Sequence, residues 1–204
     1  MSGPEVLRFA ANLYRVPLEE GYFLVDAGLS WEARRLLALL KTPPRLLFLT
    51  HHHLDHSGGA RALWERFGLP VLAHPREWPY LTGERLRPPL PIPLLGKTLA
   101  NLGPPIPKEA LVPVEEGEEV HGWRVVALPG HTLGQVGLYR EKVLLAGDAL
   151  RGGGLPPSFI NEDHELARRT VRKILDLGAE WVYLGHGGPL DRARVEALAL
   201  RLGV

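Results

Sequence analysis

Residues 50–59 read Thr-His-His-His-Leu-Asp-His-Ser-Gly-Gly, which places four imidazoles and one carboxylate within residues 51–56. Neutral imidazole nitrogens and ionised carboxylate oxygens are the groups that hold zinc and similar ions in proteins. The pattern His51-x-His53-x-Asp55-His56 lets alternate residues face opposite sides of an irregular loop, so one loop could serve two ions. Because histidine runs also arise by chance, a metal site here requires partners elsewhere in the chain.

Three further stretches each place one potential ligand on a glycine-containing turn after an apolar run. At such strand ends glycine lets the backbone bend closely around an ion. The stretches are Pro129-Gly130-His131-Thr132, Leu145-Ala146-Gly147-Asp148-Ala149 and Leu184-Gly185-His186-Gly187-Gly188. The candidate metal ligands are therefore five histidines and two aspartates: His51, His53, Asp55, His56, His131, Asp148 and His186.

These four motifs, in this order and local context, resemble the metallo-β-lactamase superfamily, and within it the dinuclear hydrolases similar to glyoxalase II. The resemblance spans nearly the whole chain. It implies an α/β (α+β) fold, the four-layer αβ/βα sandwich, as a single domain over residues 1–204. It also implies a first metal held by His51, His53 and His131, and a second held by Asp55, His56 and His186, with Asp148 bridging the two.

The same resemblance implies a metal-dependent hydrolase in which a metal-bound hydroxide cleaves a thioester, ester or lactone of a small molecule. Two divalent ions would lower the pKa of a shared water to about 7. We expect Zn²⁺ first, with Mn²⁺ or Fe²⁺ as alternatives, and Asp55 as the catalytic group that orients the hydroxide or accepts its proton. Two other functions stay open: a mononuclear iron persulfide dioxygenase-like oxidoreductase, and a metal-binding protein without turnover.

The composition fits one well-buried globular domain, with 45% hydrophobic and 23% charged residues. A net charge of +1, with both signs mixed along the chain, offers no basic stripe, so we expect no nucleic-acid partner. The chain has no cysteine, which excludes disulfides and thiolate metal ligands. One methionine, 19 prolines and many arginines suggest a thermophilic source. Because neither a signal-like N-terminus nor a run of about 18 apolar residues occurs, we expect a cytoplasmic protein with no membrane partner. The oligomeric state is not assigned.

Alternation and turn signals predict strands at residues 6–9, 13–16, 22–25, 45–50, 69–73, 118–121, 123–128, 135–139, 142–146 and 181–184. The first three are expected to be antiparallel. Four helices are predicted. The first begins after Ser30, which would be its N-cap, and the others cover residues 57–67, 162–177 and about 190–202.

Residues 75–113 contain recurrent prolines interleaved with apolar residues, a texture that argues against regular sheet. We interpret this segment as a Pro-rich insertion and possible lid, with a short helix near residues 94–102. Its alternative is a packed surface insertion. As a cover it would contribute Tyr80 and Leu95 to a substrate pocket.

Three residues after Asp148 are further substrate-binding candidates, namely Arg151, Phe159 and Asn161. Arg151 would suit a carboxylate or phosphate on the substrate, and its alternative is a solvated arginine on a glycine-rich loop.

Asp26 and the remaining histidines have two interpretations each. Asp26 ends a predicted strand and is either an orienting group near the metals or a turn-forming residue. His52 is expected to point away from the ligands as a structural or solvent-facing group. We expect His74 to lie in a turn with its hydrogen bonds satisfied, and His121 and His164 to be surface groups.

Overall fold

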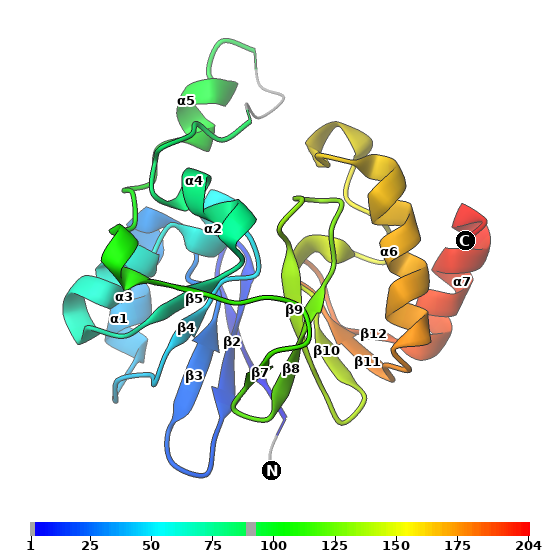
Figure 1. The fold of residues 1–204 in the computed structure, drawn as a ribbon, viewed down its shortest axis with the longest axis horizontal. Coiled ribbons are helices and arrows are strands. Elements are labelled where there is room, and N and C mark those ends of the chain that lie inside the picture. Colours follow the sequence, from blue (N-terminus) through cyan, green and yellow to red (C-terminus); the bar gives the residue numbers. More distant parts are fainter. Residues whose placement is uncertain (1–2, 89–92) are drawn as a thin grey trace. The chain divides into compact units, whose positions relative to one another are not determined.

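The computed structural model describes residues 3–88 and 93–204. The chain divides into two compact units, Met1–Pro113 and Val114–Val204, called here the first and second units (Figure 1). Each unit contains one six-stranded sheet. The prolines at 89 and 91 of the predicted insertion lie outside the described residues.

The sheet of the first unit runs in chain order from one edge to the other. Its strands are β1 (Glu5–Arg8), β2 (Asn12–Pro17), β3 (Tyr22–Val25), β4 (Leu47–Phe48), β5 (Val71–Ala73) and β6 (Leu111–Pro113). The first three pair antiparallel, as predicted, and β3 to β6 pair parallel. The ends of β3, β4 and β5 therefore lie at the same edge of the sheet, where the chain leaves each strand.

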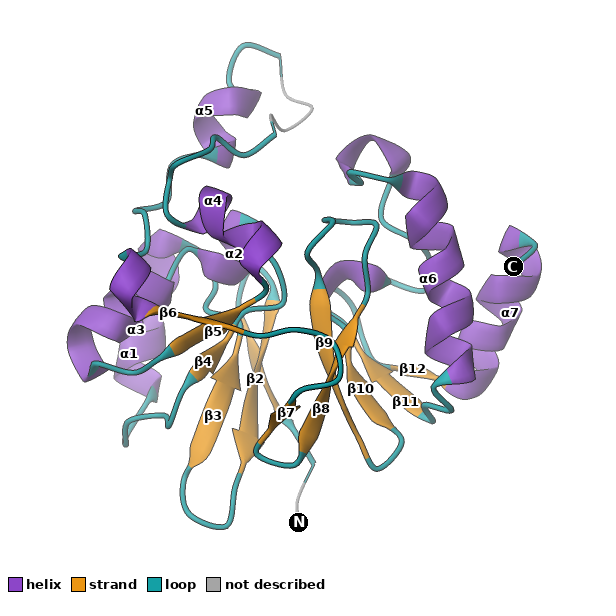
Figure 2. Cartoon of the chain, in the orientation of Figure 1, coloured by secondary structure: helices purple, strands orange, loops and turns teal. Residues whose placement is uncertain are grey.

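Short helices connect these strands. They are α1 (Ala33–Leu39), α2 (Leu54–Ser57), α3 (Ala60–Phe67), α4 (Trp78–Leu81) and α5 (Gly96–Ala100), with 3-10 turns at Ser30–Glu32, Pro75–Glu77 and Lys108–Ala110. Figure 2 shows α1 and α3 along one face of the sheet. Leucines from the two helices, Leu36 and Leu63, pack there against buried strand residues such as Leu24 and Leu47. This apolar layer fixes the helices on the sheet and so fixes the loops at the strand ends.

Three predictions for this unit need correction. Ser30 is not an N-cap, because it lies inside the 3-10 turn and Leu29 occupies the cap position. The helix predicted over residues 57–67 begins only at Ala60, as α3, and a separate short helix, α2, covers Leu54–Ser57. The Pro-rich segment does contribute strand, since β6 pairs with β5 and ends at Pro113. Proline is tolerated there because β6 is an edge strand, where a missing N–H costs no ladder bond.

The second unit has the strand order β12-β11-β10-β9-β8-β7. Its strands are β7 (Glu119–Val120), β8 (Trp123–Ala127), β9 (Val136–Arg140), β10 (Val143–Leu145), β11 (Trp181–Tyr183) and β12 (Leu190–Asp191). The predicted meander from β7 to β10 is antiparallel, whereas β10 and β11 are parallel. Strand β12 was not predicted, because its two residues were assigned to the start of the last helix.

Two long helices, α6 (His164–Asp176) and α7 (Arg192–Leu202), lie along one face of this sheet (Figure 2). Asp163 and Asp191 cap them, because each carboxylate accepts a hydrogen bond from a backbone N–H of the first turn, at 2.8 and 2.9 Å. Their apolar faces, including Ile174 and Leu198, pack against buried strand residues such as Leu144. Shorter 3-10 turns occur at Gly147–Ala149 and Ser158–Ile160.

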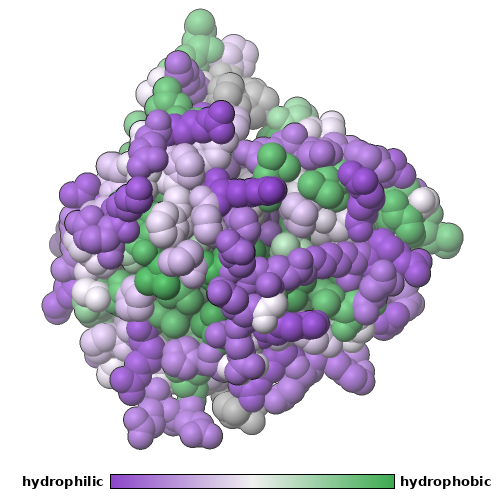
Figure 3. All heavy atoms as spheres, viewed as in Figure 1, coloured by the Kyte–Doolittle hydropathy of each residue, from purple (hydrophilic) through white to green (hydrophobic). Residues whose placement is uncertain are grey.

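The face drawn in Figure 3 carries mostly hydrophilic residues with apolar ones among them. No helix within residues 3–88 and 93–204 has the length and apolar character that a membrane span requires.

Candidate metal centre

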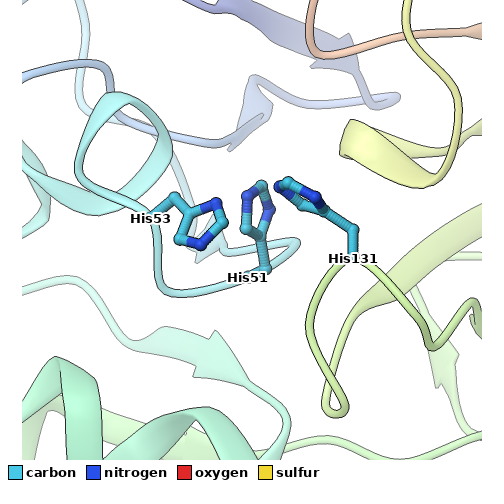
Figure 4. A group of neighbouring side chains, drawn as sticks. All are labelled: His51, His53 and His131. Atoms are coloured by element: carbon cyan, nitrogen blue, oxygen red, sulfur yellow. The ribbon is translucent and has the colours of Figure 1, made fainter. Parts of the chain in front are cut away.

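The ligand loop, residues 51–56, leaves the end of β4 and turns into α2 (Figure 4 shows its His51 and His53). His51 and His56 are fully buried, whereas Asp55 keeps about a third of its side chain exposed, 32%. The His51 ring lies 4.8 Å from that of His53 and 4.2 Å from that of His56, measured between centroids. The Nε2 atom of His56 lies 3.9 Å from an Asp55 carboxylate oxygen. The loop thus gathers all four of its predicted ligands.

Asp26, directly after β3, orients two of these histidines. It is buried and adopts the left-handed conformation, with φ of 63°. Its carboxylate accepts hydrogen bonds from the Thr50 backbone N–H at 2.9 Å, the Thr50 hydroxyl at 2.9 Å and His56 Nδ1 at 2.7 Å. Because the Thr50 hydroxyl donates to Asp26, its oxygen can accept from His51 Nδ1, 3.0 Å away. Of the two interpretations of Asp26, the structure supports the orienting group.

These bonds decide which ring nitrogen each histidine can offer to an ion. Since Nδ1 of His51 and of His56 is engaged with Thr50 or Asp26, Nε2 is the candidate metal-binding atom. A carboxylate that receives the other ring N–H is the usual companion of a metal-binding histidine, because it fixes the tautomer and the ring orientation. The first unit therefore fits a divalent ion by both its ligands and their surroundings.

The second unit brings together its own three predicted ligands. Asp148 is buried in the 3-10 turn after β10, and one of its carboxylate oxygens, Oδ2, lies 3.7 Å from His131 Nε2 and 3.5 Å from His186 Nε2. Both separations exceed a good hydrogen bond. Two atoms bound tetrahedrally to one zinc ion lie about 3.4 Å apart, given metal–ligand distances near 2.1 Å. The spacing therefore fits atoms that share ions.

His131, labelled in Figure 4, lies on the turn after β8. Its ring is held by Asn161. The Asn161 side-chain oxygen accepts from His131 Nδ1 at 3.0 Å, and its amide nitrogen donates to the Pro156 carbonyl and to His164 Nδ1. Nε2 is again the nitrogen that His131 can offer to an ion. Asn161 was predicted as a substrate contact. The structure shows its side chain hydrogen-bonded to His131, a predicted metal ligand, and a substrate contact stays a prediction.

The other predicted substrate residues differ in exposure. Leu95 and Phe159 are exposed, at 57% and 69%, and Arg151 is exposed on a turn where its backbone pairs with Gly154. Tyr80 stacks its ring on that of His52, with centroids 4.2 Å apart. A substrate role for these residues stays a prediction.

The non-ligand histidines fall largely as predicted. His52 is structural and fully buried, so its solvent-facing alternative is wrong. His74 accepts a hydrogen bond from the Arg76 backbone in a turn, as predicted. His164 is half-buried rather than a simple surface group, because it accepts from Asn161.

The sequence did not identify Thr50, Glu77 or Arg87, all of which surround the ligand loop through hydrogen bonds. Only Thr50 adjoins the motif. The other two lie in the Pro-rich segment, and nothing in their local pattern marks them.

Comparison with known proteins gives a consistent result. A family model described as the metallo-beta-lactamase superfamily matches residues 7–186. The "Probable metallo-hydrolase YflN" of Bacillus subtilis (strain 168) is 30% identical and is matched over 94% of this chain and 88% of its own length. Among solved structures, TTHA1623 in a di-iron-bound form has a TM-score of 0.78 at 30% identity, covering 96% of this chain and 97% of that one. The BLEG-1 B3 metallo-beta-lactamase has a TM-score of 0.78 at 26% identity, covering 98% of this chain and all, 100%, of that one.

Proposed function

Because the chain belongs to the metallo-beta-lactamase superfamily and has its α/β fold, we propose that it is a dinuclear metal hydrolase of small-molecule thioesters, esters or lactones. The family match covers both units and all seven predicted ligands. In this proposal, as the family resemblance implies, the first ion would be held by His51, His53 and His131. The second would be held by Asp55, His56 and His186, and Asp148 would be shared by both.

One observation carries the dinuclear proposal. A single Asp148 oxygen lies 3.7 Å from His131 Nε2, assigned to the first ion, and 3.5 Å from His186 Nε2, assigned to the second. A carboxylate between ligands of two different ions is the arrangement that a bridging group requires. The di-iron-bound form of TTHA1623, at 30% identity, supports a pair of ions. We propose zinc as the physiological metal, with manganese and iron as alternatives, because the donors are imidazole and carboxylate.

Bound divalent ions would polarise a substrate carbonyl and lower the pKa of water enough for attack at neutral pH. The protein's own contribution is to hold the donors in place before the substrate arrives. The Asp26 carboxylate and the Thr50 hydroxyl fix the His51 and His56 rings. Asp55 is partly exposed, so its carboxylate can reach solvent, and we propose that it orients the attacking water and accepts its proton.

On the substrate side, we propose that a small molecule is bound by Tyr80, Leu95, Arg151 and Phe159. The exposed Leu95 and Phe159 supply apolar area for an acyl group. The exposed Arg151 guanidinium suits a carboxylate or phosphate. Asn161 would act through His131, whose ring it holds.

The test is metal content by plasma mass spectrometry on untagged protein, followed by turnover of a panel of thioesters, esters and lactones. The expected result is about two divalent ions per chain and metal-dependent hydrolysis that a chelator abolishes. One iron per chain with oxygen uptake on a persulfide would contradict the hydrolase in favour of the oxygenase. Two bound ions without turnover of any ester class would contradict the proposed substrates.

A further inference from the structure

His52, between two ligands of the loop, is held on both sides by buried charged residues. Its backbone N–H and its Nδ1 both bond to the same Glu77 carboxylate oxygen, at 2.8 and 2.5 Å. Its carbonyl oxygen accepts from Arg87 Nε at 2.8 Å and from the Ser57 hydroxyl at 2.9 Å. The Tyr80 ring stacks on its imidazole, 20° from parallel. Both backbone polar groups of His52, the N–H and the carbonyl, are therefore held by side chains.

Glu77 and Arg87 are unusual in being charged and buried, with 2% and 8% of their surface exposed. Burial lowers the pKa of Arg87 to about 10, against the opposing effect of Glu77, so the guanidinium is still a cation at neutral pH. Buried charges are costly unless they are paired and fully hydrogen-bonded. Here both side chains hydrogen-bond to His52, and the Arg87 guanidinium also donates to the Ser57 hydroxyl at 3.4 Å. These contacts point to a role at the ligand loop.

The Pro-rich segment that supplies these residues contacts the loop a second time. Within the segment, the Arg87 backbone N–H donates to the side chain of Asn101, just after α5, at 2.8 Å. This bond ties Arg87 to the returning part of the segment. At Gly103 the approach to Leu54 is so close that an added Cβ would lie 2.4 Å from its Cδ2 atom. The segment therefore packs on the ligand loop both where it leaves β5 and where it returns toward β6.

We propose that Glu77 and Arg87 are positioning residues that fix the backbone of His52 and thereby aim His51 and His53 at the first metal ion. The inference rests on the proposed metal centre and adds to it the elements that set its geometry. The physical reason is that residues 51–53 precede α2 and lie outside helix and sheet, so no regular ladder of backbone hydrogen bonds orders them. Side chains from another segment supply that order through the backbone groups between the ligands.

The experiment measures cobalt binding to the metal-free full chain by chelator competition, together with the cobalt d–d absorption spectrum. The variants are Glu77→Ala, Glu77→Gln, Arg87→Met and Arg87→Lys. Glu84→Gln and Arg34→Met are matched controls, because both residues are exposed on the same unit. Glu77→Ala and Arg87→Met should weaken binding of the first ion about tenfold and alter the spectrum, as loss of outer-shell partners does elsewhere.

Partial rescue distinguishes positioning from a general structural role. Glu77→Gln keeps an oxygen that can accept from His52, and Arg87→Lys keeps one cationic donor, so both should regain part of the affinity. Folded variants with wild-type affinity and spectrum would overturn the inference. If Glu77→Ala or Arg87→Met does not fold, the cobalt affinity and absorption spectrum of Glu77→Gln and Arg87→Lys test the inference instead. A wild-type chain that binds no metal would instead overturn the proposed centre, and this inference with it.

Discussion

The two sets of proposed ligands are ordered in different ways. In the first unit, four proposed ligands lie within residues 51–56, on a short irregular stretch and the first turn of α2. They are held by side chains, namely those of Asp26, Thr50, Glu77 and Arg87. In the second unit, three ligands come from three separate turns, and the backbone does most of the ordering. Asp148 and His186 each follow, by three residues, a member of the register pair Leu145 and Tyr183 of parallel strands β10 and β11.

This difference shows what each arrangement needs. Parallel strands in register deliver residues at equal offsets to neighbouring points, and the hydrogen bonds from Gly185 N to the Gly147 carbonyl and from Gly152 N to the His186 carbonyl, 2.8 and 3.1 Å, join those turns. A loop with several ligands close in sequence gains nothing from strand register. It depends instead on polar side chains that reach it from elsewhere in the unit.

The largest expected effect tests whether the second unit's ligands are required at all. Asp148→Asn keeps the shape of the side chain but removes the charge proposed to bridge two ions. We expect hydrolytic activity to fall about a thousandfold or more, since several kcal/mol of charge stabilisation are lost, and the metal content to fall toward one ion. Steady-state kinetics with metal analysis measures both. Wild-type activity in this variant would remove the second unit from the proposed mechanism.

Gly130→Ala tests the claim that backbone packing orders the second unit. Gly130 has φ of 135°, and an added Cβ would lie 2.3 Å from the Ala167 backbone nitrogen in α6. Rigid backbone cannot move aside cheaply, so we expect a loss of about 3 kcal/mol in the free energy of unfolding. Gly68→Ala is the control, because it has a φ of 64° but no atom within 4 Å of the added Cβ. Chemical denaturation that gives equal losses for the two variants would contradict a packing requirement at Gly130.

The smallest effects compare the two orienting groups. Asp26→Asn keeps a residue that tolerates the left-handed backbone but replaces a charged acceptor of His56 and Thr50 by a neutral one. We expect about a tenfold loss of metal affinity, within the range known for outer-shell partners. Asn161→Ala removes only a neutral acceptor of His131 and should cost less, because charge-assisted hydrogen bonds are roughly twice as strong. Metal affinity is measured by chelator competition. A larger loss for Asn161→Ala than for Asp26→Asn would contradict this ranking of the two orienting groups.

Much of the fold could be predicted because its signals are local. The alternation of apolar residues identified nearly all the strands of both units, and the glycine turns marked the strand ends that carry His131, Asp148 and His186. The two strands that were not predicted, β6 and β12, were missed because their local sequence lacks these signals. Strand β12 is two residues long, too short for a periodic signal, and β6 lies in a Pro-rich segment where only an edge position permits it.

The sequence by itself determined the family, the α/β fold and the identity of the candidate metal ligands, because ligand chemistry and turn residues are written in short, contiguous motifs. Only the tertiary structure decided how those ligands are held. It placed Asp26 on Thr50 and His56, Asn161 on His131, and Glu77 with Arg87 on His52, across separations of 24 to 35 residues. The physical reason is that a hydrogen bond depends on distance in space, and a polar side chain carries no mark in the sequence of the distant partner that the fold will bring to it.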